Sequence, residues 1–496
     1  MKEIFSNEFY DIVKDTQTRT GLELPVHIEA YIVMLLSTYV ERDDIPPVCT
    51  FAELFMTIKT SGEAKELGDI FSKLAKEGVM FTNAYSTGSV CTPTRYALMT
   101  GQYSWRTKLK KGVVNMNDPA LIDVKRKTLP KYMQSLGYKT AIVGKWHLGF
   151  KEKKFNNLLG NIYPAPTDYG LDYSFALPNN LDDGHKVYIE NNKIYGLRSD
   201  KISPYGKSFY GKQYKGYDAP QRVTEQVTDD LTNKSIEWMK SLDKDQPFFL
   251  YYAAAAVHHP IVPSPQMRGK SNAGAYGDFI QDIDRSLGDL IAFLEERGIR
   301  ENTIIIFASD NGGDIPKKKD VMPENFAINK GLQINGDYKG DKHTIWDGGF
   351  RIPFIVNYPK KIKGDQTSNV TISTIDIYGF LADYIGNNKG LDLEDAPDSY
   401  SFKKALLKPN KFYERPPLVH RDAQGRKAIR FEGWKFIEEK NKDTKRKMNA
   451  EMLFSLTKDK KESTNLAKTE IAVVDKAKTY LTKIIEKSSK EIWKNN

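Results

Sequence analysis

The middle of this sequence alternates short, continuously apolar runs with longer amphipathic segments. The apolar runs comprise residues 139–144, 247–253, 303–309 and 353–357. Continuous rather than alternating apolar character is typical of strands that are covered on both faces. Between these runs, apolar residues recur at helical spacing over 221–242 and 275–298. The pattern predicts an α/β domain over residues 70–385, in which a mainly parallel sheet is sandwiched by helices.

The C-terminal part of the chain follows a different pattern. Residues 386–412 are polar and are interpreted as a linker. Further on, the apolar runs 428–431 and 435–437 flank a glycine-containing turn, which predicts a β-hairpin. A basic helix is expected over 470–490. We therefore predict a small antiparallel α+β subdomain over residues 413–496.

The first 69 residues fit neither pattern. Helical spacing is present over 29–39, and the pair Pro46-Pro47 would stop such a helix. We expect residues 1–69 to be helical or poorly ordered and to add no strand to the α/β sheet, which would then show a gap or an unpaired edge. Residues 1–15 are charged, and no signal peptide is visible there, so the compartment stays unknown.

The composition restricts the classes of partner. The net charge of +10 is concentrated in residues 401–496, which hold 25 Lys and Arg against 13 Asp and Glu. This excess is interpreted as solvated surface, with attraction of a polysulfated substrate as a second possibility. No recognition motif supports a nucleic-acid partner. No segment reaches the roughly 18 apolar residues of a membrane span, and two cysteines imply no disulfide framework.

One short motif points to a specific chemistry. The run Cys-Thr-Pro-Thr-Arg-Tyr-Ala-Leu-Met-Thr-Gly at 91–101 has the spacing C-x-P-x-R. It resembles the formylglycine signature of the type I, arylsulfatase A-like sulfatases of the alkaline-phosphatase-like superfamily. Taken alone, Cys91 could be an ordinary buried thiol, but four further segments match the same family in the same order.

The resemblance implies how this motif works. A formylglycine-generating enzyme would oxidise Cys91 to 3-oxoalanine, the aldehyde called formylglycine. The hydrated aldehyde would attack sulfur with one hydroxyl and expel sulfate with the other, whereas a thiol would have no easy release step. Arg95, in the same motif, is implied to anchor the hydrated aldehyde.

Two histidine-containing segments resemble further motifs of the family. Gly-Lys-Trp-His-Leu-Gly at 144–149 implies that Lys145 binds the sulfate group and that His147 acts as the base in sulfate release. In the stretch 252–260, the matching position is His258, which would contact sulfate and protonate the leaving oxygen. As isolated residues, both histidines could equally be loop residues without a catalytic role.

A lysine-containing segment completes the implied sulfate site. The stretch 338–349 resembles the family pattern K-x-x-x-W-(E/D)-G-G, in which Lys342 is the lysine that contacts sulfate. Lys339 is the neighbouring lysine and is interpreted as a solvated charge. Together, Arg95, Lys145 and Lys342 would neutralise a group whose negative charge grows in the transition state.

The implied metal site is incomplete in the sequence. Ser-Asp-Asn-Gly at 309–312 resembles the calcium segment of the family, so Asp310 and Asn311 are predicted Ca²⁺ ligands. Read alone, the segment could be a simple turn. The family normally adds two aspartates at the end of a first strand, and we find no such strand. Asp43-Asp44 is the nearest alternative, but it does not directly follow an apolar run.

The leading functional hypothesis is a sulfuric ester hydrolase that cleaves sulfate monoesters of sulfated carbohydrates or aryl sulfates. Residues 179–190 are expected to form part of the substrate rim. A catalytically impaired sulfatase-like protein is the alternative, because we do not find the N-terminal Asp-Asp metal ligands of the family. A third possibility is a phosphoester or phosphonate hydrolase of the same superfamily. Members of the family are usually exported.

Overall fold

The fold is built around one large sheet. The computed structural model describes residues 48–52, 68–316, 322–392, 394–438 and 450–487. All of them belong to the unit that spans residues 47–496. In spatial order the ten strands are β15 (Gln366–Ser368), β2 (Val79–Phe81), β14 (Phe354–Asn357), β13 (Ile304–Ala308), β1 (Val48–Ala52), β12 (Phe248–Ala253), β4 (Lys139–Lys145), β5 (Tyr173–Leu177), β6 (Ile189–Glu190) and β7 (Lys193–Ile194).

The middle of this sheet is parallel. Five neighbouring strands, β13, β1, β12, β4 and β5, all run in one direction. The strands on either side of them, β14 and β6, are antiparallel to their neighbours. The four apolar runs predicted from the sequence correspond to β4, β12, β13 and β14. The predicted fold class, a mainly parallel α/β sheet, is confirmed.

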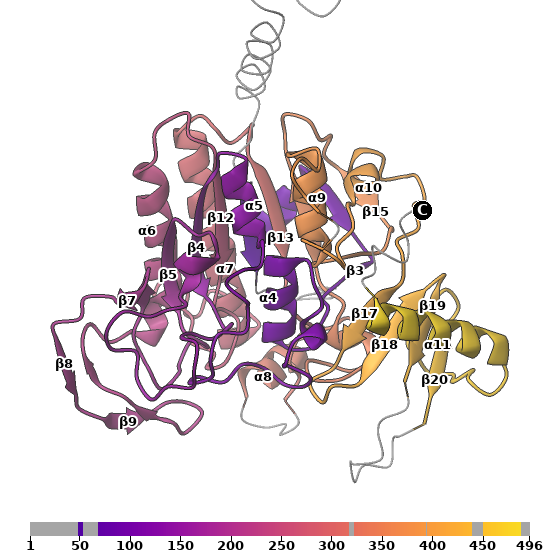
Figure 1. Cartoon of the computed structure of the whole chain (residues 1–496), viewed down its shortest axis with the longest axis horizontal. Coiled ribbons are helices and arrows are strands. Elements are labelled where there is room, and N and C mark those ends of the chain that lie inside the picture. The colour runs from indigo at the N-terminus through magenta and orange to yellow at the C-terminus, as the bar shows by residue number, and fades with distance from the viewer. Residues whose placement is uncertain (1–47, 53–67, 317–321, 393, 439–449, 488–496) are drawn as a thin grey trace, which may run out of the picture. The chain divides into compact units, whose positions relative to one another are not determined.

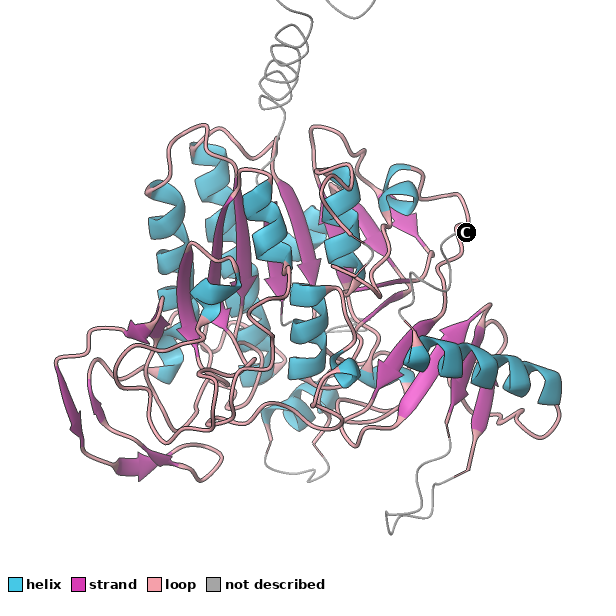
Figure 2. Ribbon diagram, viewed as in Figure 1, coloured by secondary structure: helices cyan, strands magenta, loops and turns pink. Residues whose placement is uncertain are grey.

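Helices cover both faces of the sheet (Figures 1 and 2). On one face, α3 (Asp69–Lys76), α6 (Val227–Lys240) and α7 (Gly274–Glu296) contribute to one hydrophobic cluster with the strands. On the other face lie α4 (Cys91–Thr100), α5 (Leu129–Ser135) and α9 (Asp376–Tyr384). Two short helices lie beside longer ones: α8 (Pro323–Asn329) beside α7, and α10 (Lys403–Leu407) beside α9. The described residues of the α/β part also form 3₁₀ turns at Ser104–Arg106, Pro166–Tyr169, Thr224–Gln226 and Asp347–Gly349.

The central strand β1 corrects one expectation. We expected residues 1–69 to supply no strand and the sheet to show a gap. Instead, Val48–Ala52 pairs in parallel with both β12 and β13. The difference has a physical reason, because a strand of five residues with a threonine in its middle is too short for periodicity to identify it. Residues 1–47, which include Asp43-Asp44, and residues 53–67 lie outside the described residues, and Asp69 begins α3.

Three small two-stranded sheets accompany the main one. The pair β3 (Ala84–Tyr85) and β16 (Ile372–Ser373) is parallel. Two antiparallel pairs form an arm at the lower left of Figure 1: β8 (Ser199–Ile202) with β11 (Tyr217–Asp218), and β9 (Tyr205–Lys207) with β10 (Gln213–Tyr214). The arm therefore projects beyond the β5 side of the main sheet.

The C-terminal part forms the predicted antiparallel sheet. Its strand order is β17 (Leu418–Arg421), β18 (Lys427–Phe431), β19 (Trp434–Ile437) and β20 (Met452–Ser455). The helix α11 (Ile471–Glu486) shares a hydrophobic cluster with these strands, and the cluster also takes in Tyr85 and Ala97 from the α/β part. The hairpin β18–β19 and a helix within 470–490 agree with the sequence. The domain boundaries stay predictions, and α10 lies inside the predicted linker.

A buried ion cluster joins this sheet to the α/β part. The Asp347 carboxylate accepts hydrogen bonds from Arg430 (2.5 Å) and Lys435 (2.8 Å), while Lys435 also pairs with Glu462 (2.6 Å). The backbone N–H of Asp347 donates to Glu462 at 2.7 Å. Burial by itself would raise the pKa of Asp347, but Arg430 and Lys435 hold it well below the usual range. The cluster therefore fixes the loop that contains Lys342.

We expect Asp347→Asn to destabilise the protein by about 3–5 kcal/mol, because it leaves two buried cations without their shared carboxylate. The free energy of unfolding in urea measures the effect. Glu451→Gln is the matched control, since the Lys478–Glu451 pair is largely exposed and such pairs contribute about 0–1 kcal/mol. Equal effects of the two substitutions would contradict a structural role for the cluster.

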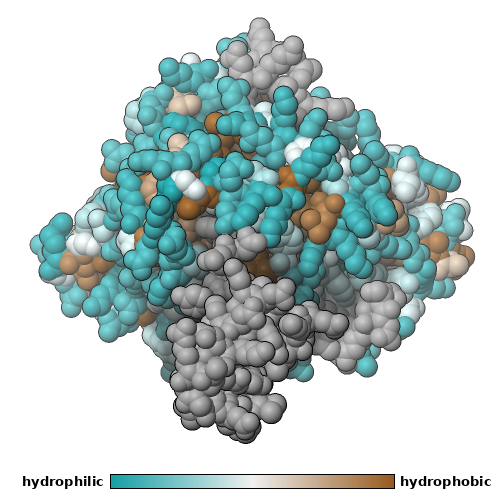
Figure 3. All heavy atoms as spheres, turned by 90° about the horizontal axis from the view of Figure 1, so that it is seen from above, coloured by the Kyte–Doolittle hydropathy of each residue, from teal (hydrophilic) through white to brown (hydrophobic). Residues whose placement is uncertain are grey.

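The face seen in Figure 3 is mostly polar where the structure describes it. Figure 3 shows a largely hydrophilic face with scattered hydrophobic patches. In the part of the chain that the structure describes, no helix combines the length and apolar character that a membrane crossing requires.

Candidate active site

The predicted site residues gather at the carboxyl ends of the parallel strands. Lys145 ends β4, His258 follows β12, and Asp310 follows β13. Ligand sites of open α/β sheets form at this edge. The backbone is tightly fitted there: Gly144 has φ +126°, and a Cβ on it would lie 1.9 Å from the carbonyl oxygen of Ala253. Only glycine allows β4 and β12 to approach this closely beside Lys145.

Cys91 is the first residue of α4 and is buried. The Lys145 Nζ lies 3.3 Å from its Sγ. The helix dipole and the ammonium group both favour negative charge developing at this position. The expectation that Cys91 begins a helix at the carboxyl edge of the sheet is thus confirmed.

Arg95 joins three parts of the site. Its Nε pairs with Asp310 Oδ2 at 3.1 Å, and its Nη1 donates to the backbone carbonyl of Lys145 at 2.7 Å. Arg95 lies one helical turn after Cys91 and is 1% exposed. The ion pair is therefore fully desolvated and fixes both the calcium segment and the end of β4 against α4.

The predicted metal ligands offer two buried oxygens. Asp310 Oδ1 and Asn311 Oδ1 have no hydrogen-bond partner among the described residues, and buried oxygens without a partner are costly unless something binds them. Carboxylate and amide oxygens are ligands that suit Ca²⁺. A Cβ on Gly312 would lie 1.9 Å from the carbonyl oxygen of Gly348, so the turn that presents these oxygens requires glycine.

These two oxygens are of the type that a hard cation binds, but they make up only part of its coordination shell. Within the described ranges, no group of three or more His, Cys, Asp and Glu side chains could hold a metal ion. The hypothesis of an impaired homologue rested on the missing aspartate ligands at the end of a first strand. A first strand is present as β1, and the residues that directly follow it, 53–67, lie outside the described residues. Asp43-Asp44, the nearest alternative that the sequence offers for the remaining ligands, lies outside the described residues.

His147 is positioned as a neutral base. Burial, together with the nearby Lys145 and Arg95 cations, lowers the pKa of His147 well below its ordinary value. Its Nε2 lies 3.1 Å from the carbonyl oxygen of Val114. Because a carbonyl only accepts, Nε2 carries the proton, and Nδ1 carries the lone pair without a partner in the described structure.

Thr92 fixes this histidine relative to the helix, which the sequence did not reveal. Its hydroxyl donates to the backbone carbonyl of His147 at 3.0 Å and accepts from the backbone N–H of Val114 at 3.2 Å. Thr92 directly follows Cys91 in the signature. It therefore couples the start of α4 to the backbone of His147 and to Val114, whose carbonyl contacts the His147 ring.

His258 is also buried and neutral. Burial and the Lys342 and Lys145 cations lower the pKa of His258 well below its ordinary value. Its Nδ1 lies 3.0 Å from the carbonyl oxygen of His259 and 3.3 Å from the hydroxyl of Tyr210. The carbonyl contact places the proton on Nδ1. His258 and Lys342 line one small cavity together, which brings Lys342 into the site.

All eight predicted residues thus converge on one place, whereas their chemical roles stay predictions. Residues 179–190, expected at the substrate rim, directly follow Pro178, whose carbonyl accepts from the N–H of His147 at 3.1 Å. Within the segment, the N–H of Asn179 donates to Asp183 at 3.1 Å. Tyr210 was missed, because nothing in the sequence distinguishes it from the chain's many other tyrosines.

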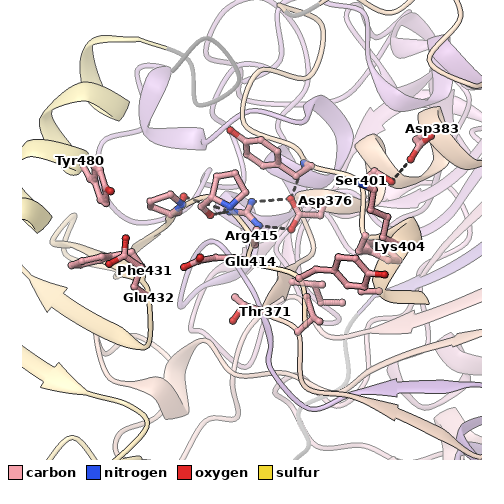
Figure 4. Close-up of a pocket in the computed structure, with 18 residues that line it drawn as sticks. Thr371, Asp376, Asp383, Ser401, Lys404, Glu414, Arg415, Phe431, Glu432 and Tyr480 are labelled. Atoms are coloured by element: carbon pink, nitrogen blue, oxygen red, sulfur yellow. Dashed lines mark hydrogen bonds and ion pairs between the residues drawn. The ribbon is translucent and has the colours of Figure 1, made fainter. Parts of the chain in front are cut away.

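A separate pocket of about 500 Å³ lies between α9, α10 and the C-terminal sheet (Figure 4). In it, the guanidinium of Arg415 binds both carboxylate oxygens of Asp376, at 2.7 and 2.8 Å. Ser401 donates to Asp383 at 2.6 Å. None of the predicted site residues lines this pocket. The predicted chemistry therefore lies elsewhere.

Buried neutral histidines should make stability depend on pH. The pKa of His185 is lowered to about 4 by burial, and those of His147, His258 and His420 are also lowered. Unfolded histidine has a pKa near 6.5, so below about pH 6.5 the unfolded chain binds more protons. Stability should be flat above this pH and should fall below it, by about 1.4 kcal/mol per pH unit for each such histidine.

Urea unfolding across this pH range measures the slope. His185→Phe should reduce it by about 1.4 kcal/mol per pH unit, since the ring stacks on Phe155 and Tyr217 and phenylalanine keeps those contacts. A stability that stays flat between pH 7 and pH 5 would contradict the buried neutral state.

Comparisons with known proteins agree with this geometry. The family model described as Sulfatase matches residues 57–387, so the match begins before residue 70, the predicted start of the α/β domain. An N-acetylgalactosamine-6-O-sulfatase of Bacteroides thetaiotaomicron is 32% identical over 442 residues, covering 81% of this chain and 85% of that protein. Human N-acetylgalactosamine-6-sulfatase is 28% identical over 334 residues, covering 64% of this chain and 57% of that protein.

A solved structure agrees with the fold. A chain from Bacteroides thetaiotaomicron, described in connection with its metabolism of multiple glycosaminoglycans, superposes with a TM-score of 0.78 at 29% identity. The superposition covers 90% of this chain and all of the other.

Proposed function

This chain belongs to the sulfatase family, and from that premise we propose that it releases sulfate from sulfated glycans with a formylglycine nucleophile made from Cys91. Membership makes it a sulfuric ester hydrolase. The observation that carries the proposal is the environment of Cys91, which is buried at the start of α4 with the Lys145 Nζ 3.3 Å from its Sγ. Relatives named N-acetylgalactosamine-6-sulfatases support a sulfated amino sugar as the substrate.

Two groups that are general features of sulfatases, formylglycine and a Ca²⁺ ion, would act at this site. Formylglycine at position 91, made by a formylglycine-generating enzyme, would supply a hydrated aldehyde with one hydroxyl for attack and a second for release. Asp310 and Asn311 would hold a Ca²⁺ ion through their two buried oxygens, and the ion would neutralise charge on the sulfate group.

The lysines supply the remaining electrostatic stabilisation. Lys145 and Lys342 are both buried, and both lower the pKa values of His147 and His258. Cations fixed in a site from which water is excluded stabilise developing negative charge more strongly than they would in water. The two lysines therefore favour an anionic group bound between them.

The two histidines divide the proton transfers. The lone pair on Nδ1 of His147 makes this residue the base for a hydroxyl at position 91. His258 is neutral in the free protein, with its proton held toward the His259 carbonyl. Burial and the lysine charges lower the pKa of His258, and a bound sulfate anion counteracts both effects. The anion therefore favours the protonated form of His258. His258 can then donate a proton to the leaving oxygen.

The experiment is a substrate panel on full-length protein co-expressed with a formylglycine-generating enzyme. The panel compares 6-sulfated N-acetylgalactosamine, an aryl sulfate, and the matching phosphate and phosphonate esters. We expect sulfate release from the sulfated sugar and the aryl sulfate to exceed cleavage of both phosphorus esters. Faster cleavage of a phosphate or phosphonate ester would assign the site to the other branch of the superfamily.

A further inference from the structure

The tip of the β9–β10 hairpin exposes two adjacent aromatic rings. Phe209 is 50% exposed and Tyr210 is 45% exposed, and Tyr205, at the start of the same hairpin, is 42% exposed. Single exposed apolar side chains are ordinary, but a contiguous group marks a binding surface. The exposed rings at the tip, residues 208–212, are therefore interpreted as part of a binding surface.

The tip is held rigidly although it is exposed. The N–H of Phe209 donates to the buried carboxylate of Asp182 at 2.6 Å, and Asp182 also accepts from Lys186 at 2.7 Å and from Tyr214 at 2.8 Å. Ser208 and Lys212 close the turn with a backbone bond of 2.8 Å. The aromatic rings are thus presented in one fixed orientation, which lowers the entropy cost of binding.

One face of Phe209 is supported from within the protein. Its ring stacks on His259 with centroids 5.5 Å apart and an interplanar angle of 3°. His259 in turn is anchored by Glu324, with Nε2 2.8 Å from Oε1. Because the ring is still half exposed, its remaining surface faces solvent as a flat apolar platform.

The platform is continuous with the candidate active site. The hydroxyl of Tyr210 lies 3.3 Å from Nδ1 of His258 and 3.3 Å from the carbonyl oxygen of His259. His258 is the residue expected to protonate the leaving oxygen of the substrate. A ring that carries the scissile sulfate ester at this histidine would therefore extend toward Tyr210 and Phe209.

The charge around the tip suits an anionic ligand. Lys201, Lys207 and Lys212 are exposed on this arm. The same arm holds two acidic residues: Asp200 is exposed, and Asp218 is paired with Arg198 at 2.7 Å. Exposed lysines beside aromatic rings match a ligand that combines apolar ring faces with negative charges.

We propose that the tip of the β9–β10 hairpin binds the sugar rings next to the reacting sulfate ester in a sulfated saccharide chain. Phe209 and Tyr210 stack on the apolar faces of the rings, and Lys207 and Lys212 pair with further sulfate or carboxylate groups. The inference rests on the proposed function, and it makes the enzyme selective for oligosaccharides over small sulfate esters.

Calorimetric binding to the full-length Cys91→Ala protein tests this without turnover. The ligand is a hexasaccharide of alternating uronic acid and 6-sulfated N-acetylgalactosamine. We expect Phe209→Ala to raise Kd about five- to tenfold, the loss of one aromatic stacking contact. Lys207→Gln with Lys212→Gln should raise Kd and weaken its dependence on salt. Phe412→Ala, at a ring 78% exposed in another segment, is the matched control and should leave Kd unchanged.

Phe209→Leu keeps an apolar contact with His259 but removes the ring, so it replaces Phe209→Ala if that variant does not fold. An unchanged Kd in a folded Phe209 variant would overturn the proposal. Equal affinity for the desulfated hexasaccharide, or for single-stranded DNA, would overturn it as well. Failure of the proposed function is a separate result, because it appears as an absence of sulfate release by the matured wild type in the substrate panel.

Discussion

Cys91→Ala is expected to lower sulfate release by about 10⁴-fold or more, the scale of losing the nucleophile of an enzyme. The side chain lies at the start of α4, with the Lys145 Nζ 3.3 Å from its Sγ, and an alanine side chain has no group that can attack sulfur. The fold should be retained, because removing one buried sulfur leaves only a small cavity. The measurement compares kcat/KM and thermal unfolding of the variant with those of the matured wild type.

Cys49→Ala is the control for this experiment. Cys49 is the second cysteine in the sequence and lies in β1 rather than in the signature. Its substitution should leave kcat/KM within a few-fold of the wild type. Loss of activity in both variants would mean that cysteine chemistry at position 91 does not explain catalysis.

Lys342→Ala is expected to lower kcat/KM by about 10²–10³-fold, the typical effect of removing one fixed group that stabilises transition-state charge. Lys342 is 5% exposed and acts on both histidines. Removing it should also raise the pKa of His258, because the Lys342 charge is the largest cause of its lowering after burial. The pH profile of kcat/KM reports this shift independently of the rate.

Lys339→Ala, three residues earlier on the same loop, is the matched comparison. Lys339 is exposed, but its Nζ donates to the backbone carbonyl of Glu462 at 2.9 Å and lies 3.6 Å from the centre of the Trp346 ring. It is therefore not the freely solvated charge that the sequence predicted. Its removal should change kcat/KM only a few-fold and leave the pH profile in place. Similar losses in the two variants would show that the loop matters structurally and that Lys342 has no special electrostatic role.

Much of the site could be predicted because each motif directly follows a strand. Once residues 139–144, 247–253 and 303–309 are read as parallel strands, Lys145, His258 and Asp310 must meet at one edge of the sheet. The start of α4 at Cys91 follows from the signature and places Arg95 one turn later. Local pattern and global fold agree here, which is what makes such residues predictable.

Other features could not be predicted, for physical reasons. The strand β1 has only five residues, and a short apolar run carries no periodicity that separates a strand from the end of a helix. The Asp347 cluster joins residues 83 and 88 positions apart in the chain, and a single sequence does not reveal such pairings. Phe209 matters through its exposure and its stacking on His259, which only the fold determines.

The central claim is tested most directly by relating aldehyde content to turnover in the same samples. Full-length protein is prepared with different extents of co-expression with a formylglycine-generating enzyme. Mass spectrometry of the peptide that contains Cys91 gives the converted fraction, and sulfate release from the 6-sulfated sugar gives the rate. We predict a rate proportional to the converted fraction, with no activity at zero conversion. Equal turnover by the unconverted protein, or no sulfate release at full conversion, would contradict the account.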